Sequence, residues 1–160
     1  MEHQKFGGPD YNPERMTWIK TNFMWMMFRC GWAKKSNQQR VLAIWLKREA
    51  FESYICNART RGTVRDFKGT VRLQWDPDHL PYGDHHHARK AVQLGLKHVP
   101  TFTSGEDILQ IEDVTPFVVQ QRVFVLKKGY DKQLLAARER LYTPSKEAAK
   151  NLEIDKPKER

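Results

Sequence analysis

The segment at residues 21–30, TNFMWMMFRC, constrains the fold more than any other part of the chain. Its apolar residues recur at the i, i+3, i+4 and i+7 spacing of a helix face, and the opposite side is apolar as well. A helix that is apolar all round must be buried or line a pocket. Thr21 can cap its start and Gly31 can end it. The residues that we expect in the core are Phe23, Met26, Met27 and Cys30.

Short strands are predicted in the middle of the chain. Residues 41–46, VLAIWL, are a continuous apolar run that is typical of an interior strand. Residues 71–75, VRLQW, alternate apolar and polar positions and predict a half-buried strand. Residues 91–96 and 107–113 predict two further strands. The polar residues 76–87, between the strands at 71–75 and 91–96, predict a loop.

Helices are predicted on both sides of this region. Residues 51–55 indicate a short amphipathic helix, and Thr115 followed by Pro116 is a typical helix opening. Asp131 can cap a last helix, whose apolar stripe would contain Leu134, Leu135 and Leu141 next to Arg138.

The mixture of elements predicts a single α+β domain over residues 15–142, with a small mixed or antiparallel central sheet packed against helices. Residues 1–14 contain two glycines and two prolines and predict an irregular N-terminal segment. Residues 143–160 lack an apolar stripe and alternate in charge, so we expect a frayed or disordered tail.

Charge is distributed unevenly along the chain. The net charge is +9, and the first 72 residues contain 14 lysines and arginines against 6 acidic residues. Clustered positive charge attracts phosphates, so a nucleotide or a nucleic acid is a plausible partner, although such residues can also merely solvate a surface. No apolar run approaches the roughly 20 residues that span a bilayer, and we expect no membrane partner. Two cysteines in no metal or redox motif predict reduced thiols and a cytoplasmic or nuclear protein.

Basic and aromatic residues alternate around the apolar helix. Arg15, Lys20 and Arg29 are interleaved with Trp18 and Trp25. A guanidinium or ammonium group can hold a phosphate while an indole stacks on a base, so these five residues predict a basic, Trp-rich pocket. Structural salt bridges are the alternative explanation for the cations, because an unpaired buried cation is costly.

The polar residues near the third predicted strand offer a second set of candidates. Three consecutive histidines in a loop cannot easily direct their rings at one ion, and their spacing fits no zinc signature, so we expect no metal. His87 could act as an acid or base near pH 7, and Arg89 could hold a phosphate. Gln93 lies between two apolar strand positions and is expected to face away from the core.

Several motifs occur in the order known from one family. They are RMTWIK, WMMFRCGW, VLAI, VRLQWDPD, RKAVQLGL and IEDVTPFV, and they extend from Arg15 to about Val118. With these motifs the chain resembles the proteins grouped as domain of unknown function 4291, a family without an assigned activity. Thr21-Asn22 replaces the Pro-Ser that is usual there. The family's usual N-terminal segment with a YQAY-type strand has no counterpart, so we expect either a shortened form or a member in which that strand is dispensable.

Three functions follow as hypotheses. The first is binding of a nucleotide or nucleic-acid phosphate in the Trp-rich pocket. The second is an NAD-consuming transferase, because the order of elements is loosely similar to the ADP-ribosyl type; that resemblance implies NAD as the cofactor, Gln93 as the residue that orients the ribose, and His87 and Arg89 close by. The third is a protein-interaction adaptor, which would need the aromatic helix to be exposed.

Overall fold

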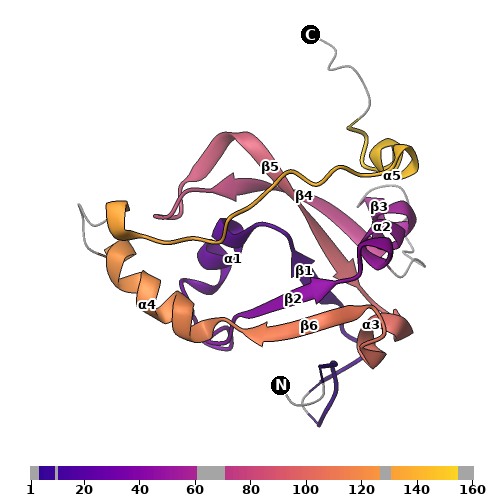
Figure 1. The fold of residues 1–160 in the computed structure, drawn as a ribbon, viewed down its shortest axis with the longest axis horizontal. Helices are drawn as coiled ribbons and strands as arrows, with labels where there is room; N and C mark the ends of the chain where they lie inside the picture. Colours follow the sequence, from indigo (N-terminus) through magenta and orange to yellow (C-terminus); the bar gives the residue numbers. More distant parts are fainter. Residues whose placement is uncertain (1–3, 10, 61–70, 127–130, 155–160) are drawn as a thin grey trace.

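The computed structural model describes residues 4–9, 11–60, 71–126 and 131–154. The chain forms an α+β fold with a four-stranded mixed sheet and a separate two-stranded antiparallel sheet, which confirms the predicted class (Figure 1). The larger sheet has the order β1 (Thr17–Lys20), β5 (His85–Leu96), β4 (Val71–His79) and β3 (Arg59–Thr60). The smaller sheet pairs β2 (Leu42–Leu46) with β6 (Ile108–Asp113).

Helices surround the two sheets, and no helix of the described residues is long and apolar enough to cross a membrane. They are α1 (Phe23–Cys30), α2 (Arg48–Asn57), α3 (Pro100–Ser104), α4 (Thr115–Leu126) and α5 (Lys146–Asn151), with a short 3₁₀ helix, η1, at Asp131–Gln133. In the described part of residues 1–14 there are turns but no helix or strand.

Alternation along the strands gives the larger sheet one apolar and one polar face. In the β4–β5 pair, Leu73 is opposite Leu94, and Gln74 is opposite Gln93. Because neighbouring residues of a strand point to opposite faces, the leucines lie on one face and the glutamines on the other. On the other edge of β5, Lys20 of β1 is also opposite Gln93 and therefore shares the polar face.

Two hydrophobic clusters form the core. The apolar face of the larger sheet packs against α2, α3, α5 and the smaller sheet, around residues such as Ile55, Leu94 and Phe102. The second cluster lies between α1 and α4, where Met27 and Cys30 are buried against Val118. Phe23 and Met26 are partly buried and pack against this cluster. The prediction that these four residues of α1 belong to the core is therefore confirmed.

The ends of α1 follow from local chemistry. The cap is Asn22 and not Thr21, because the Asn22 side chain accepts a hydrogen bond from the backbone N–H of Trp25 at 2.7 Å. Gly31 ends the helix with a φ of 57°, as predicted, and Trp32 and Ala33 continue the left-handed conformation with φ values of 53° and 61°. Left-handed backbone is costly for residues with a Cβ, so this turn depends on the burial of both side chains.

Two strand predictions need correction. Residues 17–20 form β1, a strand that the sequence patterns did not predict. Residues 76–87 are not a loop: they extend β4 and β5 into a long hairpin whose turn is residues 80–84. Most polar residues of this hairpin are exposed or half-buried, but Asp78 and His79 are buried.

The C-terminal predictions were also wrong. Among the residues described after α4, only η1 is helical near Asp131. Residues 134–145, here called the strap, have no regular structure and run from η1 across α1 to α5 (Figure 1). The tail beyond the strap is not disordered over its described part, because α5 buries Ala148 and Leu152 in the main cluster. Ser145 caps α5, a signal that the charge pattern of the tail obscured.

Candidate functional site

Lys20, which was predicted to hold a phosphate, is neutralised inside the protein. Its Nζ lies 2.7 Å from Oδ2 of Asp76 and donates to the carbonyl of Ala91 at 3.2 Å, and its side chain is 1% exposed. The ring of Trp25 covers the ammonium group at 4.3 Å. Burial lowers the pKa of Lys20, while the Asp76 carboxylate acts in the opposite direction. Lys20 and Trp25 therefore form a closed internal contact, which corrects the prediction of an open pocket at these residues.

Arg89 is paired with a carboxylate as well. Its guanidinium lies 2.9 Å from Oδ2 of Asp78, and this carboxylate is almost completely buried. The same aspartate accepts a hydrogen bond from the backbone N–H of His79 at 2.7 Å. Arg89 remains well exposed, but the carboxylate of Asp78 already balances its charge.

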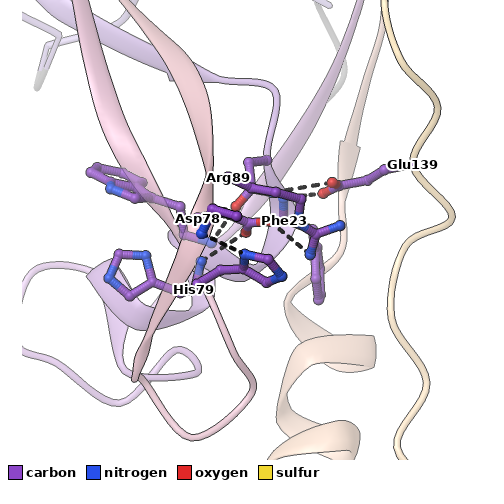
Figure 2. Close-up of polar contacts among 9 residues, drawn as sticks. Phe23, Asp78, His79, Arg89 and Glu139 are labelled. Atoms are coloured by element: carbon purple, nitrogen blue, oxygen red, sulfur yellow. Dashed lines mark hydrogen bonds and ion pairs between the residues drawn. The ribbon is translucent and has the colours of Figure 1, made fainter. Parts of the chain in front are cut away.

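The strap supplies a carboxylate to the N-terminal end of α1. Glu139 accepts hydrogen bonds from the backbone N–H of Phe23 at 2.6 Å and from the side-chain amide of Asn22 at 3.1 Å. Figure 2 shows Glu139 reaching the start of α1, with Arg89 and Asp78 nearby. The first turn of α1 contains no acidic residue of its own, so a distant segment provides the negative charge that the helix dipole favours.

The C-terminal end of α1 is different, because its cations have no carboxylate partner among the described residues. Arg29, Lys34 and Lys35 are all exposed. Arg29 faces the neutral amide of Gln38, which in the orientation that suits both groups accepts from Nη1 of Arg29 at 3.0 Å. Lys35 donates to the carbonyl of Phe28 at 3.2 Å, which places a cation at the end of the helix.

The left-handed turn after α1 places the two lysines. The backbone N–H groups of Lys34 and Lys35 donate to the carbonyl of Cys30 at 3.1 and 3.0 Å, so the chain folds back over the last turn of the helix. Arg122 of α4 fixes this turn by donating to the carbonyl of Trp32 at 3.2 Å. The lysine stems therefore start from an anchored backbone.

Aromatic rings join this end of α1 to the tip of the β4–β5 hairpin. Phe28 is 41% exposed and stacks on His79 with centroids 4.0 Å apart, and His85 meets the same ring edge-on at 6.5 Å. Trp32 donates from Nε1 to the carbonyl of Pro81 at 3.3 Å, which holds the hairpin turn against the helix end. Tyr82 follows in that turn and is 53% exposed.

We call this surface the basic tip and define it by six exposed residues: Arg29, Lys34, Lys35, Phe28, Tyr82 and His85. Of these, only Arg29 was predicted as a site residue. The sequence does contain a basic loop after the helix and a Pro-Tyr-Gly turn. That these two segments meet is visible only in the structure, where Phe28 stacks on His79 and Trp32 bonds to Pro81.

His79 lies beneath the basic tip. It is 2% exposed, and neither ring nitrogen has a hydrogen-bond partner within the described part of the chain. Burial lowers the pKa of His79, and the neighbouring His85 acts in the same direction. A neutral imidazole therefore packs under Phe28.

The remaining predicted residues do not converge. Arg15 is exposed, and Trp18 is 37% exposed and packs over Gly95, two residues before Lys20 on the same face of β1. Gln93 is 8% exposed on the polar face of the sheet, whereas His87 is exposed. At about 3.3 Å per residue, His87 and Gln93 lie roughly 20 Å apart along β5. The structure thus does not bring these two candidates together.

Two small cavities lie near α3, away from all of these residues. One of about 230 Å³ is lined mainly by apolar groups, among them Leu96, Val99 and Phe102. The other, of about 170 Å³, contains the hydroxyl of Tyr54, which donates to Asp107 at 2.5 Å. No group of three potential metal ligands converges within the described ranges.

The comparisons with known proteins give a family without an activity. No curated protein and no solved structure matches the chain. A family model described as domain of unknown function (DUF4291) matches residues 1–142 of the 160 residues. The chain therefore belongs to the DUF4291 family.

Proposed function

We propose that the protein binds the phosphates of a nucleotide or nucleic acid through the basic tip. The observation that carries the proposal is the difference in charge pairing. Lys20 and Arg89 each contact an aspartate, whereas Arg29, Lys34 and Lys35 are exposed and have no ion pair among the described residues. Their charge is therefore available to a ligand.

The chemistry of the tip suits a phosphate-bearing ligand. Exposed cations attract phosphates over several ångströms and gain free energy when counterions are released. Asp84 lies in the hairpin turn between Tyr82 and His85. Its carboxylate forms no ion pair with the cations of the tip within the described residues. Exposed rings beside the cations can contact sugars and bases.

A matched pair of double variants tests this function. Lys34→Gln with Lys35→Gln removes two charges at the tip, and Lys146→Gln with Lys150→Gln removes two charges on α5, where both lysines are exposed. Fluorescence anisotropy with a labelled oligonucleotide should show affinity weakened on the order of tenfold for the tip variant. The α5 variant should remain close to the unmodified protein. Equal effects of the two variants would contradict a site at the tip.

A second candidate function is supported by Gln93. Gln93 is 8% exposed and lies opposite Lys20 of β1 and Gln74 of β4, so three polar side chains share this face of the sheet. On this reading the protein cleaves nicotinamide from NAD, with Gln93 orienting the ribose. Incubation with NAD should then release nicotinamide, and Gln93→Ala, but not the exposed Gln110→Ala, should abolish the release.

A further inference from the structure

We infer that the basic tip binds single-stranded nucleic acid in preference to duplex and to mononucleotides, with Tyr82 as the ring on which a base stacks. The inference rests on the proposed function of the tip. It follows from two properties of the surface: an exposed ring that makes no ring contact with another described residue, and exposed cations without an ion pair among the described residues.

Tyr82 is the ring of the tip that is available for stacking. It is 53% exposed and makes no ring contact with another described residue. Phe28, by contrast, stacks on His79, and the ammonium group of Lys35 lies 5.4 Å from its centroid. Phe28 therefore supports the surface, and Tyr82 can receive a base.

The turn holds Tyr82 in place without covering it. The backbone N–H of Gly83 donates to the carbonyl of Leu80 at 2.9 Å, and the N–H of Leu80 donates to the carbonyl of Asp84 at 2.8 Å. The carbonyl of Pro81, the residue before Tyr82, accepts the hydrogen bond from Nε1 of Trp32. A ring on a fixed turn loses little conformational entropy when a base stacks on it.

The cations favour a strand over a single nucleotide. Arg29 lies in the last turn of α1, whereas Lys34 and Lys35 lie in the turn beyond it, and none of them lines either cavity near α3. Exposed cations can contact successive phosphates of a backbone, whereas one small ligand usually sits in a concave pocket.

The exposed ring distinguishes a single strand from a duplex. In a duplex each base is already stacked on its neighbours and its faces are inaccessible. In a single strand a base can leave the stack and lie on an aromatic side chain, and such contacts are tolerant of sequence. The tip should therefore prefer single strands without a strong sequence preference.

The experiment measures binding of one labelled sequence as a single strand and as a duplex, and of the corresponding mononucleotide, by anisotropy and competition. Four proteins are compared: the unmodified chain, Tyr82→Ala, Tyr82→Phe, and Trp45→Ala as a control for loss of an exposed ring elsewhere, since Trp45 is 57% exposed on β2. Tyr82→Ala should weaken single-strand binding by about 5- to 100-fold. Tyr82→Phe and Trp45→Ala should stay within about twofold, and duplex binding should not respond to Tyr82→Ala.

The outcomes separate this inference from the proposed function. If Tyr82→Ala leaves single-strand affinity unchanged, or if duplex or mononucleotide binds as tightly as the single strand, the inference is wrong, while a lysine effect at the tip keeps the proposed function. If neither the lysine pair nor Tyr82 affects binding of any of the three ligands, both are wrong.

Discussion

The two ends of helix α1 differ in whether their charged side chains have partners. At the N-terminal end, Lys20 meets Asp76, and the carboxylate of Glu139 arrives from a segment more than 110 residues away to bind Asn22 and Phe23. At the C-terminal end, Arg29, Lys34 and Lys35 remain exposed without a carboxylate partner among the described residues. The difference teaches that basic residues close together in a sequence can have separate roles, one end stabilising the fold and the other available to a ligand.

The largest effect is expected from breaking the buried ion pair at the N-terminal end. Asp76→Ala leaves the Lys20 ammonium group buried without its partner, which should lower the free energy of unfolding by about 3 kcal/mol. Urea unfolding followed by tryptophan fluorescence measures this. Arg40→Ala is the control, because the Arg40–Asp113 pair is largely exposed and its loss should cost less than about 1 kcal/mol. Similar losses of unfolding free energy in both variants would contradict a structural role for the Lys20–Asp76 pair.

The contact between the strap and α1 should contribute less. Glu139→Ala removes the acceptor from the Phe23 N–H and the Asn22 amide and should cost about 1 kcal/mol of unfolding free energy. Glu139→Gln keeps an acceptor but loses the charge, so its cost should be smaller and less dependent on salt. The neighbouring Arg138→Ala serves as the control and should have little effect. A stabilising Glu139→Ala would mean that the strap does not cap the helix.

A pH-dependent loss of stability is expected at the C-terminal end. The pKa of His79 is lowered by burial and then by His85, so the unfolded chain takes up a proton at a higher pH than the folded protein. The stability from the buried neutral ring is present above the ordinary value of 6.5 and falls as the pH drops from there towards the lowered folded value. His79→Phe keeps the stack on Phe28 without a titrating group. Its unfolding free energy, followed from pH 7.5 to 5.5, should fall less steeply, and an unchanged slope would assign the pH dependence to other groups.

The smallest effect on stability is expected from the exposed lysines themselves. Lys34→Gln with Lys35→Gln should change the unfolding free energy by less than about 1 kcal/mol, because neither lysine has an ion pair among the described residues and the contact of Lys35 with the end of α1 is exposed. Thermal unfolding by circular dichroism measures this change. A loss as large as that of Asp76→Ala would make the two ends of α1 energetically alike and would end the comparison.

Local patterns predicted much of the fold. The apolar helix, the Thr115-Pro116 helix opening and the strands around Ile44, Leu73 and Leu94 all follow from periodicity and capping chemistry. The strap could not be predicted in this way, because Leu134 and Leu141 have helical spacing while the segment is held by distant partners, Gln121 and Glu52.

The site was predicted less well, for a physical reason. Whether a lysine is paired depends on strand register, which sequence spacing does not reveal: Lys20 meets Asp76 only because β1 and β4 both flank β5. The tip likewise depends on the length of the hairpin that brings Tyr82 to the end of α1.

The salt dependence of binding tests the central claim most directly. The affinity for a single-stranded oligonucleotide is measured across a series of salt concentrations for the unmodified protein and for Lys34→Gln with Lys35→Gln. If both lysines contact phosphates, the slope of log K against log salt concentration should become shallower by about 1.4, which is about 0.7 for each lost contact. An unchanged slope would contradict the claim that the C-terminal end of α1 is the end that binds phosphate.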